Sequence, residues 1–182
     1  MTNIKILNDN LVNQIAAGEV IERPASVVKE LCENSIDSNA DNLEVEITAG
    51  GIKSIKVTDN GTGILKDDLS LSVQRHATSK ISTLEDLDSL YSLGFRGEAL
   101  ASIASVSRLR IMSATEENNA YMIEATDTNS NSELTPVAHP IGTTVLVNDL
   151  FYNTPARRKF LRTEITEYKK IEECICLLYT SP

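Results

Sequence analysis

The stretch Lys29-Glu30-Leu31-Cys32-Glu33-Asn34-Ser35-Ile36-Asp37 decides the fold, because one helix here carries both a packing face and a polar face. Pro24 suits a first helical turn, since its ring fixes φ and it has no N–H to lose. We therefore expect a helix from Pro24 to about Ser38. Apolar residues recur at helical spacing on one side, at Val27, Val28, Leu31, Cys32 and Ile36.

The other side of this helix presents Glu30, Asn34 and Asp37 at the same three-and-four spacing. Such a polar face is either solvated surface or part of a binding site. The residues immediately downstream favour a site. Alternating apolar residues predict a hairpin with strands at 42–48 and 53–58, which runs into the glycine-rich loop 59–63.

The remaining pattern alternates helices and strands along the rest of the chain. We expect a helix through Leu11 and Ile15 that begins near residues 8–10 and ends at Gly18, and a short helix at 66–74. Residues 75–81 and 92–98 lack an apolar period and predict loops. The other expected elements are a buried helix at 98–105, strands at 108–114 and 120–125, a strand around Val145 and Val147, and a basic helical segment opened by Pro155.

Composition indicates one globular domain in the cytoplasm. The chain has 182 residues, 41% hydrophobic and 24% charged, enough to bury a core. It has no run of eighteen apolar residues and no N-terminal signal pattern, so neither a membrane nor export is expected. The three cysteines, Cys32, Cys174 and Cys176, lack zinc-site spacing and predict free thiols.

Charge is distributed unevenly, although the net value is −9. Residues 111–156 contain six acids and no Lys or Arg, whereas residues 151–170 contain six basic residues and two acids. We hypothesise that Arg157, Arg158, Lys159 and Arg162 contact DNA phosphates. A packed structural helix is the alternative, because Phe160 and Leu161 lie among these charges.

Several common chemistries are excluded by missing motifs. A P-loop requires a Gly-Lys pair, which the chain lacks, and the dinucleotide fingerprint requires a third glycine after Gly61 and Gly63. A zinc hydrolase would need His-Glu-x-x-His, whereas His76 and His139 are far apart in sequence.

The polar residues that remain suit a magnesium nucleotide. Mg²⁺ accepts one amide oxygen together with phosphate oxygens, so Asn34 is a possible ligand. Glu30, one turn earlier, can take a proton from a water that attacks the γ-phosphate. Asp59 can accept the exocyclic N–H of adenine, while the loops that contain Lys80 and Arg96 can fold over phosphates.

These residues carry a resemblance to a known group. Residues 30–34, 59–63, 94–100 and 142–144 are similar to the four motifs of the Bergerat-type ATPases, which include DNA gyrase, a heat-shock chaperone, histidine kinases and MutL. Residues 11–20, 23–24, 76–80 and 151–161 narrow the resemblance to the N-terminal ATPase domain of the MutL family of DNA mismatch repair proteins. It covers about residues 4–174.

The resemblance implies an α+β fold, a two-layer sandwich of a mixed, mainly antiparallel sheet with helices on one face. It implies Glu30 as general base, Asn34 on Mg²⁺, Asp59 on adenine and Thr144 near the base. The positions implied to bind ATP are Asn34, Asp37, Asp59, Gly61, Gly63, Ile64, Thr78, Ser79, Lys80, Gly94, Phe95, Arg96, Gly97, Glu98, Ala99, Leu100 and Thr144.

The implied activity is that of an ATP-gated repair ATPase. Its ATP-bound form would form a homodimer through this domain and recruit a mismatch-sensing protein and a downstream nuclease or helicase. The alternative is a gyrase-like or chaperone-like module of the same fold. A histidine kinase would need a phosphoacceptor histidine on a preceding helical hairpin, and the sequence supplies none.

The sequence departs from the family at its end. Residues 174–182 differ where the family continues a helix into a second subdomain. We therefore expect an ATPase domain over residues 1–174 and an atypical tail over 175–182 at a truncation point. Because the family takes a phosphate-binding lysine from the next subdomain, we expect weak or no ATP turnover from residues 1–182 alone.

Overall fold

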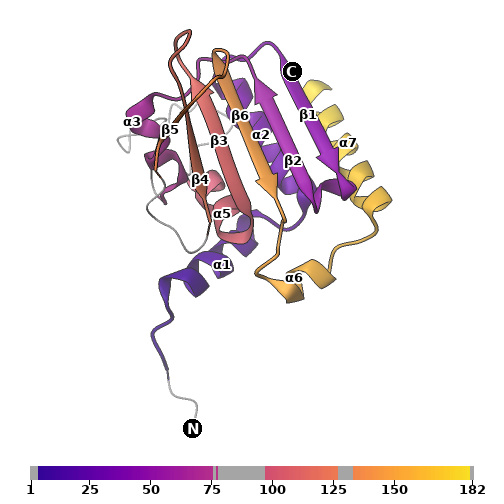
Figure 1. Cartoon of the computed structure of the whole chain (residues 1–182). Coiled ribbons are helices and arrows are strands. Elements are labelled where there is room, and N and C mark those ends of the chain that lie inside the picture. Colours follow the sequence, from indigo (N-terminus) through magenta and orange to yellow (C-terminus); the bar gives the residue numbers. More distant parts are fainter. Residues whose placement is uncertain (1–3, 76, 78–96, 127–132, 181–182) are drawn as a thin grey trace, which may run out of the picture.

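One antiparallel sheet of six strands forms the first layer of the molecule (Figure 1). The computed structural model describes residues 4–75, 77, 97–126 and 133–180. Each described strand pairs antiparallel with its neighbours. Across the sheet the strands are β1 (Leu43–Thr48), β2 (Ser54–Asp59), β6 (Gly142–Asn148), β3 (Arg108–Ala114), β4 (Ala120–Ala125) and β5 (Thr135–Val137).

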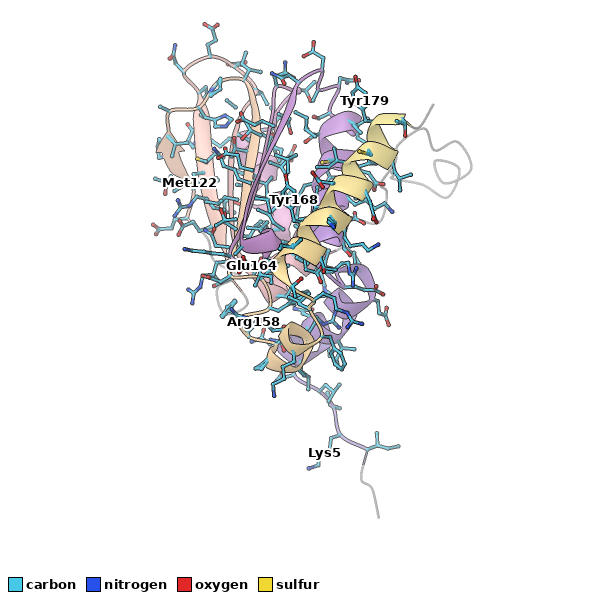
Figure 2. All side chains as sticks on the ribbon, turned by 90° about the vertical axis from the view of Figure 1, so that its right-hand side faces the viewer. Lys5, Met122, Arg158, Glu164, Tyr168 and Tyr179 are labelled. Carbon is cyan, nitrogen blue, oxygen red and sulfur yellow. The ribbon has the colours of Figure 1, made fainter. Side chains whose placement is uncertain are left out.

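Helices form the second layer. They are α1 (Asp9–Val20), α2 (Pro24–Asp37), α3 (Lys66–Leu69), α5 (Ala99–Val106), α6 (Pro155–Lys159) and α7 (Glu164–Thr180), with single turns η1 (Ala49–Gly51) and η2 (Leu71–Val73). Helix α2 packs against α7 and β2, and α1 packs against α5. Figure 2 shows the layers side-on, with Met122 on the sheet and Tyr168 and Tyr179 on α7.

Strand alternation separates the two faces of the sheet. The register aligns Ile55 with Val147 and Val57 with Val145, and these side chains are buried on the helix side. The opposite face carries paired charges, including Lys56 with Glu46 at 2.6 Å. The predicted two-layer α+β sandwich with helices on one face is therefore confirmed, and its mainly antiparallel character holds for every described strand pair.

The predicted helix ending at Gly18 is too short. Helix α1 starts after Asn8, whose side chain accepts the Leu11 N–H at 2.8 Å, and continues through Gly18 to Val20. A Cβ at Gly18 would lie 1.8 Å from the Arg157 guanidinium. This glycine therefore allows Arg157 to approach the helix rather than ending it.

The predicted helix at 66–74 is also corrected. The chain forms α3 only as far as Leu69 and then tightens into the turn η2. Leu69 is fully buried, and the Ser72 hydroxyl donates to its carbonyl at 2.6 Å. A side-chain hydrogen bond of this kind competes with continued helix.

Helix α7 passes through the predicted boundary between residues 174 and 175. It continues past Cys174 and Cys176 to Thr180 without interruption. The boundary between residues 174 and 175 therefore stays a prediction that no secondary-structure break marks. None of the described helices is both long and apolar enough to cross a membrane.

The predicted free thiols are confirmed for all three cysteines. Cys32 lies on the buried side of α2 and is 2% exposed, whereas Cys176 is exposed on α7. Burial, with smaller contributions from Cys174 and Glu33, raises the pKa of the Cys32 thiol to about 12. The thiolate, which is the reactive form, is therefore strongly disfavoured at Cys32.

We expect thiol reagents to distinguish these positions. With a pKa of about 12, the thiolate fraction of Cys32 at pH 8 is about 10⁻⁴. A maleimide should modify Cys176 rapidly and Cys32 only after unfolding, as followed by peptide mass spectrometry. The same reaction in denaturant is the control, and equal labelling rates in the folded protein would contradict the buried placement.

Candidate functional site

The Asp59 carboxylate, at the end of β2, joins three separate elements. It is 9% exposed and accepts three hydrogen bonds. The Ser35 hydroxyl of α2 donates to Oδ2 at 2.7 Å, and the N–H groups of Gly61 and Thr143 donate to Oδ1 at 3.0 and 3.2 Å. Helix, loop and β6 therefore converge on one charged group.

The glycine-rich loop after β2 is held against the sheet. Gly63 has a φ of +74°, and a Cβ there would lie 2.1 Å from the Ala114 carbonyl oxygen. The next residue, Ile64, donates its N–H to the Ser113 hydroxyl at 2.8 Å. Backbone from this loop therefore lies beside Asp59 in a conformation that a side chain at Gly63 would disrupt.

Glu30, Asn34 and Asp37 lie on α2 as predicted, and all three are partly buried. Asn34 immediately precedes Ser35, the residue that ties this helix to Asp59. Glu30 is one turn earlier on the side that carries Asn34. The structure therefore places the predicted base and the predicted metal ligand on the same helix that contacts the predicted adenine acceptor.

Thr144, predicted to lie near the base, is not brought to Asp59. Its hydroxyl hydrogen-bonds with Nε2 of His139 at 2.7 Å and donates to Oγ1 of Thr58 at 3.2 Å. Asp59 pairs with Thr143 in the register, so Thr144 belongs to the opposite face of the sheet. Thr143, one residue earlier, contacts Asp59, and the predicted place of Thr144 near the base stays a prediction.

Three residues of this cluster were missed by the sequence reasoning: Ser35, Ser113 and Thr143. The hydroxyls of Ser113 and Thr143 lie 2.8 Å apart beside the glycine loop. A signal for Thr143 was available, because strand alternation places it on the face of Val145 and Val147, which were already expected in one strand. A serine within a helix carries no comparable signal.

Part of the predicted phosphate lid can be placed. Gly97 has a φ of +62°, Glu98 precedes the first turn of α5, and Ala99 and Leu100 form that turn. The Ser102 N–H donates to the Glu98 carbonyl at 2.8 Å. The other predicted lid residues, Thr78, Ser79, Lys80, Gly94, Phe95 and Arg96, lie outside the described residues and stay predictions.

The metal prediction rests on Asn34. Within the described parts of the chain, no group of three or more His, Cys, Asp or Glu side chains could hold a metal ion. An ion at this site would therefore take an amide oxygen from α2 and complete its shell with ligand and water oxygens. Mg²⁺ tolerates that arrangement, because it retains several waters when bound.

The four predicted DNA-contacting cations differ in their exposure. Arg157 is partly buried, donates from Nη1 to the Ile21 carbonyl at 2.7 Å and lies over the Phe151 ring. Arg157 therefore makes contacts within the domain, and its predicted contact with DNA stays a prediction. Arg158, Lys159 and Arg162 are exposed.

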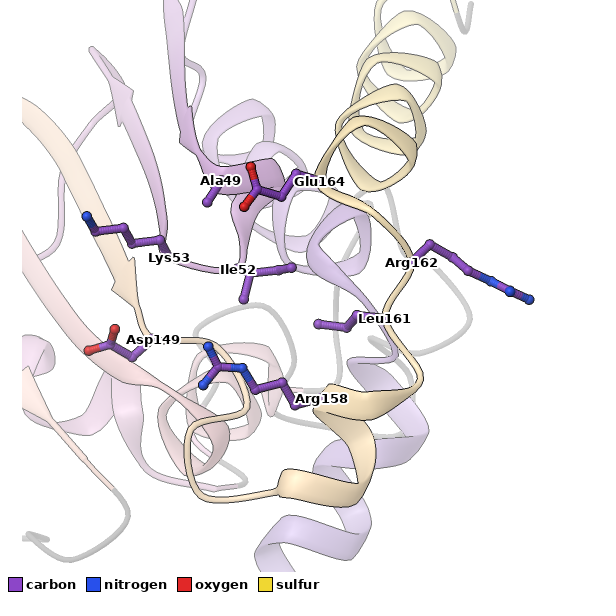
Figure 3. Close-up of a pocket in the computed structure, with 8 residues that line it drawn as sticks. All are labelled: Ala49, Ile52, Lys53, Asp149, Arg158, Leu161, Arg162 and Glu164. Carbon is purple, nitrogen blue, oxygen red and sulfur yellow. The ribbon is translucent and has the colours of Figure 1, made fainter.

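Arg158 extends into a pocket of about 470 Å³, while the Arg162 side chain points away from it (Figure 3). Lys53, just before β2, lines this pocket, whereas Asp59 ends the same strand. The pocket is therefore about 17–20 Å from the Asp59 cluster and forms a separate feature. Its lining residues are Ala49, Ile52, Lys53, Asp149, Arg158, Leu161, Arg162 and Glu164.

Comparison with known proteins defines the class. Residues 21–149 match the family model described as "Histidine kinase-, DNA gyrase B-, and HSP90-like ATPase". The chain belongs to this ATPase family. Within it, the chain is 60% identical over 173 residues to the DNA mismatch repair protein MutL of Serratia proteamaculans and 59% identical to MutL of Escherichia coli.

These alignments cover 94% of the chain but 28% of each relative, so the chain spans little more than a quarter of their length. Among solved structures, the Aquifex aeolicus MutL ATPase domain complexed with ADP has a TM-score of 0.68 and 40% identity, covering 86% of this chain and 54% of that one. The N-terminal domain of a DNA repair protein has a TM-score of 0.75 and 34% identity, over 95% and 50%. The predicted resemblance to the MutL ATPase domain is confirmed, and the gyrase-like or chaperone-like alternative is not favoured.

We expect Gly63→Ala to destabilise the folded domain by about 1–3 kcal/mol, because it combines an unfavourable φ with a backbone clash. Urea unfolding followed by circular dichroism measures this free energy. Leu65→Ala, at an exposed position two residues later, is the matched control and should change it by less than about 0.5 kcal/mol. Equal midpoints for the two variants would contradict the constrained loop.

Proposed function

We propose that this chain binds ATP with Mg²⁺ and hydrolyses it as the ATPase domain of a DNA mismatch repair protein in the cytoplasm. The observation that carries the proposal is the buried Asp59 carboxylate, held by α2, the glycine loop and β6. Membership of the ATPase family and the identity with MutL support it. The ADP bound to the Aquifex domain indicates the class of ligand.

Asp59 would recognise adenine with the acceptor capacity it has left. A carboxylate has about four lone-pair positions, and hydrogen bonds from this domain use three. The exocyclic amino group of adenine can donate to the fourth. Because three donors already fix the carboxylate, it needs no rearrangement to bind the base, which favours affinity.

Glu30 and Asn34 would act at the phosphate end of the nucleotide. They are four residues apart, which separates them by about 6 Å along α2. Mg²⁺ held by Asn34 and by phosphate oxygens would neutralise charge on the triphosphate. Glu30 would take the proton from the attacking water, a contribution of about 10² to 10⁴ in rate.

The remaining predicted ATP-binding residues divide into two groups. Gly61, Gly63 and Ile64 follow Asp59 in the glycine-rich loop, and Asp37 lies on α2 two residues after Ser35. These four residues would border the base. Residues 97–100 at the start of α5, together with the rest of the predicted lid, would contact phosphates through backbone N–H groups. Weak turnover from residues 1–182 alone stays a prediction.

A homodimer that forms with ATP is supported by exposed apolar side chains at the N-terminus. Ile4 and Ile6 lie on an arm that extends away from the body, and Leu11, Val12 and Ile15 of α1 are exposed (Figure 1, Figure 2). Apolar residues gathered on one exposed segment indicate an interaction surface. Recruitment of a mismatch sensor and a downstream nuclease or helicase is proposed from the relatives alone.

Substitutions of Asp59 and Glu30 should separate binding from chemistry. In the full-length protein, Asp59→Asn should weaken ATP binding by about tenfold to 100-fold, because a charged hydrogen-bond acceptor is lost. Glu30→Ala should leave affinity nearly unchanged and lower turnover by about 10² or more. Calorimetry and steady-state phosphate release measure the two effects, and similar loss of affinity in both variants would show that the roles are wrongly divided.

DNA contact can be tested at Arg158, which is exposed and has no packing role of the kind seen at Arg157. Arg158→Glu in the full-length protein should weaken DNA binding and reduce the slope of log affinity against log salt by about 1. Lys170→Glu, an equal charge reversal on α7, is the control and should have little effect. An unchanged affinity and salt slope for Arg158→Glu would leave the basic segment with a structural role.

A further inference from the structure

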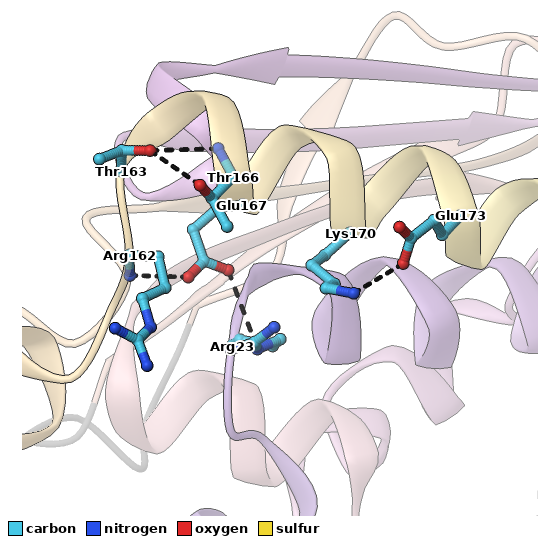
Figure 4. A network of polar contacts seen from close by, with 7 residues as sticks. All are labelled: Arg23, Arg162, Thr163, Thr166, Glu167, Lys170 and Glu173. Atoms are coloured by element: carbon cyan, nitrogen blue, oxygen red, sulfur yellow. Dashed lines mark hydrogen bonds and ion pairs between the residues drawn. The ribbon is translucent and has the colours of Figure 1, made fainter.

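Glu167, on the first part of α7, is a fully buried carboxylate at 0% exposure. Its Oε1 accepts the Arg162 N–H at 2.8 Å, and its Oε2 lies 3.9 Å from Nε of Arg23 (Figure 4). Oε2 accepts no hydrogen bond from the described part of the chain. Burying a charged group whose hydrogen bonds are incomplete costs free energy of folding. Stabilisation of the fold therefore does not by itself account for a carboxylate at this position.

Its partner, Arg23, occupies the N-cap position of α2. The Arg23 side chain makes no capping hydrogen bond, so it is available to extend toward α7. Two residues earlier, the Ile21 carbonyl accepts a hydrogen bond from Arg157 of α6 at 2.7 Å. The short connection between α1 and α2 is therefore held by α6 and by α7.

Helix α2 is thus attached by polar contacts near both ends. Ser35 ties its C-terminal part to Asp59, and Glu167 ties Arg23 at its N-terminus. The two attachments are twelve residues apart, about 18 Å along the axis. Glu30 lies between them, about 7.5 Å from Ser35, whereas Asn34 lies about 1.5 Å from it.

We propose that Glu167 is a positioning residue for Glu30, acting through Arg23 and the axis of α2. Loss of the Arg23 attachment lets the helix shift about the Ser35 contact. Such a shift displaces Glu30 several times further than Asn34, because displacement grows with distance from the end of the helix that Ser35 holds. The inference rests on the proposed function, in which Glu30 activates water and Asp59 and Asn34 bind the nucleotide.

The test compares Glu167→Gln, Arg23→Gln and the double variant in the full-length protein. Glutamine at position 167 keeps an acceptor for the Arg162 N–H, removes the charge and places an NH₂ donor where Oε2 faces Arg23. Turnover at saturating ATP should fall about tenfold or more, since small misplacement of a catalytic group has a large effect on rate. The dissociation constant for ATP should change by less than about twofold, because Asp59 remains in place.

The double variant should lose no more turnover than either single variant, because both substitutions remove one interaction. Glu173→Gln, which removes an exposed charge paired with Lys170 on the same helix, is the control and should leave turnover unchanged. Urea unfolding of each variant establishes that the assays compare folded proteins. Arg23 is partly exposed, so Arg23→Gln tests the contact even if Glu167→Gln does not fold.

Three results would each overturn the positioning role. They are unchanged turnover in the single variants, parallel losses of turnover and ATP affinity, and additive losses of turnover in the double variant. Failure of the proposed function is distinguishable, because the unsubstituted protein would then lack ATP turnover or Glu30→Ala would not reduce it. If Glu30→Ala removes turnover and Glu167→Gln does not, only the positioning role is wrong.

Discussion

The arrangement depends on the need to satisfy one buried carboxylate. Asp59 lies at a strand end where water is largely excluded, so its oxygens must find donors within the protein. Two of the three donors are backbone N–H groups, from the glycine loop and from β6, and the third is a serine on α2. The group can be satisfied only if β6 lies beside β2 and α2 crosses this end of the sheet. Sheet order and helix placement are therefore tied to the site.

The two ends of β2 differ in the polar groups that surround them. The Asp59 end gathers hydroxyls and backbone N–H groups, whereas the Lys53 end opens on a pocket lined by opposite charges. The apolar residues of the sheet lie between them. Helix α2 spans a comparable distance, since its start contacts α7 and its last turns contact Asp59.

Elements with strong periodicity were predictable from the sequence. The helix that carries Glu30 and Asn34 and the following hairpin appear as expected, because their apolar stripes match the buried faces. The residues proposed to bind the nucleotide on these elements were chosen from residue type and spacing. Side-chain direction and long-range contacts were not predictable in the same way. Thr144 faces away from Asp59 because the strand alternates, and Thr143 makes the contact with Asp59.

The contacts of Arg157 within the domain could not be predicted from the sequence either. As one of several adjacent cations, it resembled a phosphate contact, but Gly18, far away in sequence, leaves space for its guanidinium beside α1. Local composition contains no information on such a space. Glu167 was likewise counted only as an acid within a basic segment, because its burial depends on α2 and α7 packing together.

Helix α2 shows why buried polar contacts are needed near this site. Pro24 favours its first turn, but it has no side-chain cap at Arg23 and no acid in that turn, so polar side chains nearby in sequence contribute little to its starting point. Its apolar face packs on a sheet and another helix, and apolar contacts are non-directional, which leaves its axial position weakly defined. Hydrogen bonds and ion pairs depend on direction and distance. In the proposed function, the base Glu30 must meet water within hydrogen-bond reach, and the contacts of Ser35 and Arg23 would fix its helix at the two ends.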